Sequence, residues 1–219
     1  IRALALSGLN LFAGTSSAGV FLSTNNGTSW TAVNSGLTNN SVFSLAVSGT
    51  NVFAGTFGGG VFLSTNNGTS WTAVNSGLTN NSVFSLAVSG TNLFAGTNGG
   101  GVFLSANDGT SWTAVNSGLT NTTVLSLATS GSNLFAGTST GGVFLSTNNG
   151  TSWTAVNSGL TNNSIFSLAV SGTNLFAGTN GGGVFLSTND GTSWSVVNTG
   201  LSNTFVRSLA VSGTNLFAG

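Results

Sequence analysis

The chain has 219 residues, of which 39% are hydrophobic and only 2% are charged, and its formal net charge is zero. Its only ionisable side chains are Arg2, Asp108, Asp190 and Arg207, so it offers no basic surface for phosphates and no acidic surface for cations. We therefore expect no nucleic-acid partner. We also expect no membrane insertion, because no apolar run approaches the roughly 20 residues of a membrane-spanning helix.

A repeat runs through the whole sequence. The pattern Ser-x-Asn-x-Gly-Thr-Ser-Trp occurs five times, and its last residue recurs every 41 positions, at Trp30, Trp71, Trp112, Trp153 and Trp194. A second pattern, Leu/Val-Phe-Ala-Gly, keeps the same spacing along the chain. A fixed period near forty residues with strand-like content predicts the blades of a β-propeller.

The repeat unit at 82–120 shows the predicted strands in chain order. The apolar run 83–88 predicts a strand that is buried on both sides and ends in a Ser-Gly-Thr-Asn turn. A second strand is expected at 92–97, and a glycine-rich reversal joins it to a third at 102–105. The sequence Asn-Asp-Gly then predicts a hairpin to a fourth strand at 110–115, which is more polar and suits a sheet edge.

Four strands per repeat, joined by short hairpins, predict an all-β fold: a β-propeller of four-stranded antiparallel blades without helices. A parallel β-solenoid is the alternative, but its coils repeat at a shorter period and seldom need three sharp hairpins. We expect a single repeat domain over residues 1–219, with five full blades and the first two strands of a sixth. The blades are expected at approximately 1–34, 42–75, 83–116, 124–157, 165–198 and, in part, 206–219.

Both ends of the sequence fall inside the repeat. Residues 1–14 and 206–219 match the same first two strands of a unit. A closed propeller usually completes one blade with strands from both termini, and two copies of the same strand pair do not complete each other. We therefore expect that the natural polypeptide continues, to about six to eight blades, or that another chain covers the exposed strands.

The octapeptide that ends in each tryptophan resembles the Asp-box, also called the BNR repeat, whose usual form is Ser-x-Asp-x-Gly-x-x-Trp. The sequence around it resembles that of bacterial sialidase-like and photosystem assembly factor-like propellers. The resemblance implies a structural hairpin between the third and fourth strands, at the blade periphery, with the tryptophan packed into the blade. The residues of this turn would be Ser23, Asn25, Gly27, Trp30, Ser64, Asn66, Gly68, Trp71, Ser105, Asn107, Gly109, Trp112, Ser146, Asn148, Gly150, Trp153, Ser187, Asn189, Gly191 and Trp194.

The position that carries aspartate in the Asp-box holds asparagine in all five copies. Asparagine still accepts the backbone hydrogen bonds of an Asx-turn, but it supplies no carboxylate. Asp108 and Asp190 stand one position later, beside glycine, where tolerance of left-handed backbone angles explains them. Metal ligation is the alternative, although hard cations usually need more than one carboxylate. We expect no metal site and no cofactor.

The resemblance does not extend to catalysis. Sialidases with this box use an arginine cluster, a tyrosine nucleophile and acidic partners, whereas the chain has no Tyr and no Glu. Glycosidases need two carboxyl groups close together, and Asp108 and Asp190 lie two repeats apart at equivalent turns. A nucleophilic serine would find no His, Lys or Glu to take its proton. We therefore expect no catalytic residues and no enzyme activity.

One aromatic residue breaks the repeat. Phe and Trp at fixed repeat positions predict core residues, but Phe57 stands where other units carry Ser16, Asn98, Ser139 or Asn180. An exposed Phe in a glycine-rich loop is suited to stack on a sugar or to contact a partner, although single exposed apolar residues are common.

Two functions are compatible with these features. The first is a non-enzymatic extracellular structural or interaction protein, such as a scaffold, adhesin or filament subunit, which presents a repetitive uncharged polar surface. Its partners would be further copies, in an oligomer or fibre, or cell-surface proteins. The second is a lectin, a multivalent carbohydrate-binding propeller with glycans as partners. For both we expect an extracellular or cell-surface location, in bacteria.

Overall fold

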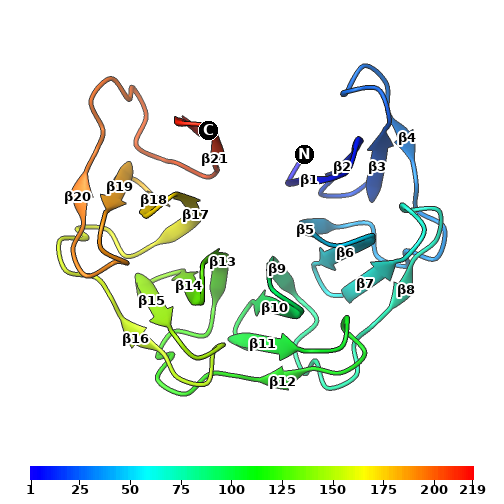
Figure 1. Cartoon of the computed structure of the whole chain (residues 1–219), viewed down its shortest axis with the longest axis horizontal. Coiled ribbons are helices and arrows are strands. Elements are labelled where there is room, and N and C mark those ends of the chain that lie inside the picture. Colours follow the sequence, from blue (N-terminus) through cyan, green and yellow to red (C-terminus); the bar gives the residue numbers. More distant parts are fainter. The chain divides into compact units, whose positions relative to one another are not determined.

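The computed structural model describes residues 1–219 and consists of strands β1 to β22 and their connections (Figure 1). No helix long and apolar enough to cross a membrane is present. The strands form five sheets of four strands and one of two strands, and all pairings are antiparallel. The predicted β-propeller fold, with five full blades and the start of a sixth, is therefore confirmed.

The chain forms two compact units, Ile1–Ala114 and Val115–Gly219. The first unit contains three blades. Their strands are β1 (Ala3–Ser7), β2 (Asn10–Gly14), β3 (Val20–Ser23) and β4 (Thr31–Ala32); β5 (Val42–Ser48), β6 (Asn51–Thr56), β7 (Gly60–Ser64) and β8 (Thr72–Ala73); and β9 (Val83–Ser89), β10 (Asn92–Thr97), β11 (Val102–Ser105) and β12 (Thr113–Ala114).

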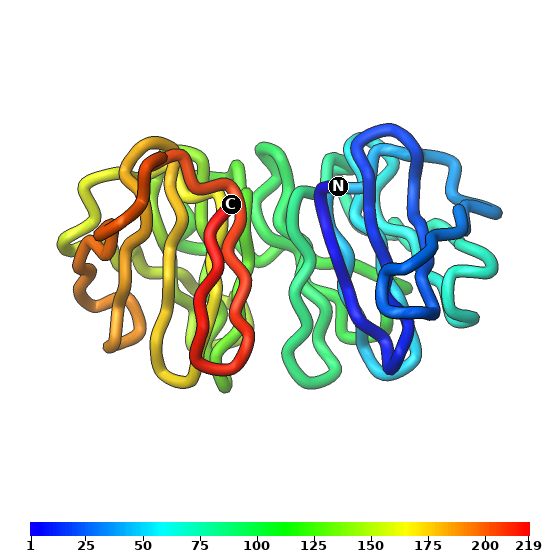
Figure 2. The backbone as a smooth tube through the Cα atoms, turned by 90° about the horizontal axis from the view of Figure 1, so that it is seen from above, coloured from blue at the N-terminus to red at the C-terminus, as the bar shows by residue number.

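The second unit contains two blades and a two-stranded sheet. The strands are β13 (Val124–Ser130), β14 (Asn133–Thr138), β15 (Val143–Ser146) and β16 (Thr154–Ala155); β17 (Ile165–Ser171), β18 (Asn174–Thr179), β19 (Val184–Ser187) and β20 (Ser195–Val196); and β21 (Leu209–Ser212) and β22 (Asn215–Ala218). The β21–β22 hairpin, red in Figure 2, packs beside β17.

The fourth strand of each blade is shorter than predicted. Strands β9, β10 and β11 lie where the sequence places them, but β12 covers only Thr113–Ala114 instead of 110–115. The reason is local, because the two residues at 110 and 111 bond back into the turn: the backbone N–H groups of Thr110 and Ser111 donate to Asn107, at its carbonyl oxygen (3.0 Å) and its Oδ1 (2.9 Å).

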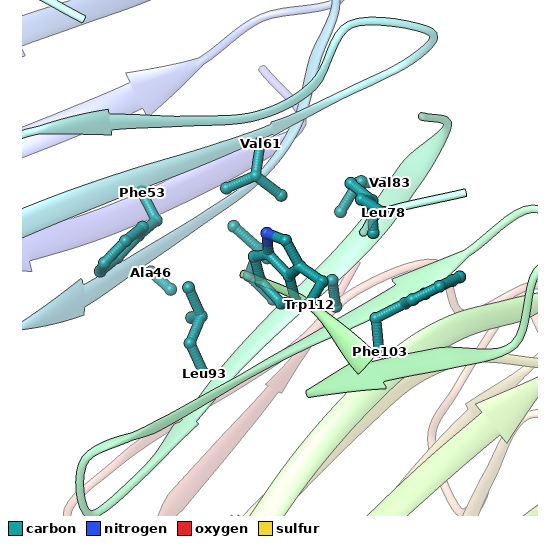
Figure 3. Packing of buried hydrophobic residues seen from close by; sticks show 10 residues of the cluster. Ala46, Phe53, Val61, Leu78, Val83, Leu93, Phe103 and Trp112 are labelled. Atoms are coloured by element: carbon teal, nitrogen blue, oxygen red, sulfur yellow. The ribbon is translucent and has the colours of Figure 1, made fainter. Parts of the chain in front are cut away.

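Neighbouring blades within each unit pack face to face. Side chains alternate along β6, so that Val52 and Ala54 point to the first blade while Phe53 points to the third. Figure 3 shows the second of these interfaces, where Val61 lies beside the Trp112 ring and Phe53 belongs to the same cluster. Each such fully buried large side chain contributes roughly 1.5–3 kcal/mol. The core of the fold therefore lies between the sheets.

The second unit repeats this packing. Phe135 and Val143 of one blade lie in one cluster with Phe185 and Trp194 of the next. Backbone groups add to the interface: the Ser126 hydroxyl accepts the N–H of Leu168 at 2.9 Å, one blade further along the chain. The contact between blades thus includes hydrogen bonds as well as apolar surface.

Candidate functional site

The Ser-x-Asn-x-Gly-Thr-Ser-Trp octapeptide forms a compact turn in every blade, here called the repeated turn. In the first copy, the Ser23 hydroxyl donates to Asn25 Oδ1 (3.0 Å) and accepts the Gly27 N–H (2.9 Å). Asn25 Oδ1 also accepts the Ser29 N–H, and its Nδ2 donates to the Ser29 hydroxyl, both at 2.9 Å. The same bonds recur in the turns at 64–71, 105–112, 146–153 and 187–194.

The asparagine thus organises the turn through both ends of its amide. Its Oδ1 accepts two hydrogen bonds, and a carboxylate oxygen would accept them as well. Its Nδ2 donates a third hydrogen bond, to a serine hydroxyl, which a carboxylate has no N–H group to donate. The next residue has a left-handed backbone, with φ of 54–56° at all five copies. Asp108 and Asp190 occupy this left-handed position, one in each unit, as do Asn26, Asn67 and Asn149 in the other copies. No three His, Cys, Asp or Glu residues come together as metal ligands.

The tryptophan of the repeated turn contacts the neighbouring blade, beyond the packing into its own blade that the resemblance implies. Trp71 donates its Nε1–H to the Val33 carbonyl at 2.7 Å and its backbone N–H to the Ser35 carbonyl at 2.8 Å. The same two bonds join Trp112 to Val74 and Ser76, Trp153 to Val115 and Ser117, and Trp194 to Val156 and Ser158. The four rings are 4–5% exposed, whereas Trp30 of the first blade is 39% exposed.

Phe57, the residue that breaks the repeat, is 47% exposed at the end of β6. Its backbone N–H donates to the Ser41 carbonyl at 2.9 Å, which fixes the loop. Its ring lies 5.7 Å from the Phe43 ring and 6.0 Å from the Phe84 ring, between ring centres. The sequence-based candidate is therefore the exposed member of a cluster of three phenyl rings, whose other two members are half-buried.

Two arginines lie over phenyl rings, and sequence reasoning missed both. The Arg2 guanidinium stands 5.0 Å from the centre of the Phe43 ring, and in the second unit Arg207 stands 5.2 Å from that of Phe166. Such cation–π contacts contribute about 0.5–1 kcal/mol at exposed sites. A signal was present in the sequence. Position 2 and its repeat equivalents carry Arg, Phe, Phe, Leu, Phe and Arg, so this place in the repeat holds both charged and aromatic residues.

Chemically, the surface of the repeated turns consists of hydroxyl and amide groups. Around the first turn, Thr24, Asn25, Asn26, Thr28 and Ser29 are exposed, and their equivalents in the other turns are exposed as well. Only Asp108 and Asp190 add charge to this set. The arrangement offers many hydrogen-bond donors and acceptors in fixed positions, which suits binding.

A comparison with protein-family models finds a match to the DUF6242 beta propeller domain over residues 39–164. This span is more than half of the chain. A search of curated proteins found no match.

Solved structures of similar fold include three instructive cases. An ancestral GH74 enzyme is 24% identical, with a TM-score of 0.77, over 95% of this chain and 33% of that enzyme. The extracellular domain of a proposed one-component system, BT4673, from B. thetaiotaomicron is 18% identical, with a TM-score of 0.79, over 100% of this chain and 31% of that protein. YCF48, bound to a D1 peptide, is 15% identical, with a TM-score of 0.74, over 99% of this chain and 74% of that protein.

These likenesses show the fold alone. The chain spans only about one third of the length of the GH74 and B. thetaiotaomicron structures, at 33% and 31%. The activity of that enzyme and the role of that extracellular domain therefore belong to those proteins.

Proposed function

The chain belongs to the DUF6242 beta-propeller domain family, and from this premise we propose that it is a non-enzymatic structural or interaction protein. It acts outside the cell or at the cell surface and makes multivalent contacts through its repeated turns. One observation carries this proposal: the same exposed and uncharged hydrogen-bonding groups are presented at five equivalent turns. Weak contacts that are repeated along one chain add up to strong binding.

The internal bonds of the turns support a binding role. The backbone N–H of Ser29 and the hydroxyl of Ser23 are both held by Asn25 Oδ1, so the exposed neighbours Thr24 and Thr28 sit on a fixed backbone. Groups that are already ordered lose little conformational entropy on binding. The same fold is an extracellular domain in B. thetaiotaomicron and carries a peptide in YCF48, which are settings of the proposed kind.

The test adds charge to the repeated turns without altering their backbone. Asp108 and Asp190 already occupy the left-handed position at φ 54°, so the triple variant Asn26→Asp, Asn67→Asp, Asn149→Asp should fold normally. If copies associate side by side through the repeated turns, this lateral association should be weaker in the triple variant than in the unaltered protein at low ionic strength. Light scattering and electron microscopy of the purified proteins measure it. The association should recover at about 1 M salt, where the screening length is near 3 Å.

The matched control removes charge from the same position. The double variant Asp108→Asn, Asp190→Asn should associate laterally at least as well as the unaltered protein, with no dependence on salt. An unchanged lateral association in the triple variant at low salt would show that the repeated turns are not the contact surface.

A second candidate function, a lectin, is favoured by the phenyl cluster around Phe57. Aromatic rings that are held on the surface stack on the apolar faces of sugars, and the Asn39 amide lies beside this cluster, where its Nδ2 donates to the Phe57 carbonyl at 3.1 Å. A glycan array would test the lectin with Phe57→Asn, the residue that two other units carry at this position. Phe205→Ser, which removes another exposed ring, in the second unit, is the control.

For a lectin we expect glycan binding by the unaltered protein, a loss of about two- to tenfold in Phe57→Asn, and normal binding in the control, because an aromatic contact contributes about 0.5–1.5 kcal/mol. Absence of array binding by the unaltered protein would remove this candidate and leave the interaction role in place.

A further inference from the structure

Three turns of the second and third blades surround a polar hollow, here called the turn hollow. It measures about 340 Å³ and is lined by Ser48, Gly49 and Asn51 of the β5–β6 hairpin, Gly90 and Thr91 of the β9–β10 hairpin, and Ala106 and Asp108 of the repeated turn after β11. All of these residues belong to the first unit, and none lies in the first or the last repeat. A hollow of this size lies at the lower end of the range for small-molecule sites.

The polar side chains around the turn hollow are available to a ligand. No hydrogen bond or ion pair within the chain involves the side chains of Ser48, Asn51, Thr91 and Asp108. The adjacent Asn107 differs, because its amide is bonded inside the turn. Two hydroxyls, one amide and one carboxylate therefore surround the same space without partners of their own.

The repeat departs from its usual sequence at this hollow. The second residue of the repeated turn is alanine only at Ala106, whereas the other copies carry Thr24, Thr65, Thr147 and Thr188. The fourth residue is aspartate at Asp108 and Asp190 and asparagine elsewhere. The third blade alone combines the two changes. Alanine lacks the methyl and hydroxyl groups of threonine, so this blade leaves room beside a carboxylate.

The backbone holds these groups in place. Asp108 has a left-handed φ of 54°, and the preceding Asn107 accepts the Ser111 N–H at 2.9 Å. Ser48 and Asn51 face each other as the last pair of the β5–β6 ladder. Groups that are ordered before binding lose little conformational entropy when a ligand arrives.

The lining of the turn hollow suits an uncharged ligand with several hydroxyl groups. Asp108 repels anions, and one carboxylate is too few for a hard cation such as Ca²⁺. An ammonium group would meet the Nδ2 donor of Asn51, and no large apolar side chain is present to hold an apolar ligand. A sugar hydroxyl both donates and accepts, as do the Ser48 and Thr91 hydroxyls. Two neighbouring sugar hydroxyls match the two oxygens of a carboxylate.

We propose that the turn hollow binds one neutral sugar unit of a glycan. Two neighbouring hydroxyls of the sugar donate to the Asp108 carboxylate, and Ser48, Asn51 and Thr91 bond the remaining hydroxyls. The affinity of the single site is in the millimolar range, because it has hydrogen bonds but no aromatic ring for stacking. The proposal goes beyond the contacts of the repeated turns described above.

The turn hollow is separate from the cluster around Phe57. Strands β5 and β6 pair from Val42–Thr56 at one end to Ser48–Asn51 at the other. Phe57 directly follows the first of these pairs, whereas the turn hollow lies at the second. Binding at the hollow therefore does not depend on the phenyl rings.

The experiment records backbone amide NMR signals of the isotope-labelled protein during titration with methyl glycosides of mannose, galactose and glucose, each alone. With at least one of them we expect saturable shifts of the Gly49 and Gly90 amides, which line the hollow. Gly131 and Gly172 are the equivalent glycines of the second unit, where Thr188 stands in place of alanine. Their amides serve as the internal control and should not shift.

Two variants test the side chains that distinguish the third blade. Asp108→Asn and Ala106→Thr each introduce the residue that other repeats carry, so both should fold normally. Asp108→Asn should weaken sugar binding by about tenfold, because hydrogen bonds to a charged group are among the strong ones. Ala106→Thr should weaken it severalfold by filling the space beside the carboxylate.

A third variant should create a second site. Thr188→Ala places an alanine two residues before Asp190 and so completes the same pair in the second unit. With the same sugar we expect the Gly131 and Gly172 amides to shift in this variant, while the shifts of Gly49 and Gly90 stay as in the unaltered protein.

Four outcomes would overturn the proposal. These are the absence of shifts with all three sugars, unchanged sugar affinity in Asp108→Asn, equal shifts at the control glycines of the unaltered protein, and shifts with methylammonium or calcium chloride but with no sugar. The last would assign the turn hollow to a cation. Lateral association through the repeated turns is measured without sugar, so failure of this site and failure of that surface can be told apart.

Discussion

The first and second blades have almost the same sequence and differ in what covers them. Their repeated turns hold the same hydrogen bonds, with Asn25 and Asn66 each accepting a backbone N–H at 2.9 Å. Their tryptophans differ, because Trp71 is 4% exposed against the first blade and Trp30 is 39% exposed. The strands and turns of a blade are therefore encoded within one repeat, whereas the burial of its tryptophan comes from the preceding blade.

This comparison assigns stability to interfaces between neighbours. In repeat proteins the free energy of folding is close to a sum of unit terms and nearest-neighbour terms. The two blades share the unit term, but the second packs against a neighbour on both faces and the first on one face only. Substitutions at matched positions should thus separate the two terms.

The largest expected effect is at the tryptophans. Trp71→Ala should lower the free energy of unfolding by about 3–5 kcal/mol, because it empties a buried site and removes the Nε1 bond to the Val33 carbonyl. Trp30→Ala should cost only about 1–2 kcal/mol, because its ring is partly in water and has no covering blade. Urea unfolding followed by far-UV circular dichroism measures both values. Equal losses in the two variants would contradict the assignment of stability to the interfaces between neighbouring blades.

Trp71→Phe sharpens the same comparison. The phenyl ring keeps most of the buried apolar surface but has no donor for the Val33 carbonyl, which is bonded at 2.7 Å in the unaltered protein. An intermediate loss of about 1–3 kcal/mol is expected from the unpaired carbonyl and the smaller ring. A loss as large as that of Trp71→Ala would place the whole contribution in the hydrogen bond.

The second-largest expected effect on stability is at a glycine that follows the fourth strand of each blade. Gly77 and Gly200 stand at the same repeat position with φ of 83° and 85°. A Cβ at Gly77 would press on the Trp112 carbonyl oxygen of the next blade, whereas a Cβ at Gly200 would meet no atom within 4 Å. Both alanine variants carry the left-handed strain of about 1–2 kcal/mol. Gly77→Ala adds a backbone clash of about 1–3 kcal/mol.

Thermal unfolding of the two variants checks this second prediction. Gly77→Ala should have the lower midpoint by several degrees, since the strain is common to both and only the clash differs. Matching midpoints would mean that the loop at Gly77 moves away from Trp112 without cost. The contact between blades would then be softer than the bond from Trp112 N–H to the Ser76 carbonyl, at 2.8 Å, indicates.

The sequence was sufficient to predict what depends on the repeat itself. The 41-residue period, the Asn-Gly and Asp-Gly turns and the apolar runs predicted the propeller fold and, in the unit at 82–120, the three inner strands β9 to β11 within one residue. These features are local, because turn chemistry and strand alternation act over a few residues. The outer strand was predicted too long, since Asn107 draws two of its residues into the turn.

Features that depend on neighbours could not be predicted in this way. The sequence does not show that Trp71 donates to Val33, 38 residues earlier, because the bond depends on how two blades face each other. The cluster of Phe57 with Phe43 and Phe84 is also a product of stacking, as three separate units contribute one ring each. Only a change of residue type, at Arg2 and at Phe57 relative to their equivalents in the other repeats, signalled that these sites differ.

The smallest effect concerns hydrogen bonds at covered faces. Ser126 and Ser44 occupy the same repeat position, yet the Ser126 hydroxyl accepts the Leu168 N–H at 2.9 Å, while the buried Ser44 hydroxyl has no partner. Ser126→Ala should cost about 1 kcal/mol, the usual net value of such a bond. Ser44→Ala should be neutral or slightly stabilising, because it removes a desolvated hydroxyl.

Denaturant unfolding of both serine variants, with amide hydrogen exchange at Leu168, separates bonding from burial. Loss of the Ser126 acceptor should speed exchange of the Leu168 amide, whereas Ser44→Ala should leave that amide unchanged. Equal destabilisation by the two variants would mean that Ser44 is bonded in solution. In that case the contact between the second and third blades would include the same hydrogen bond as the contact in the second unit, in addition to apolar packing.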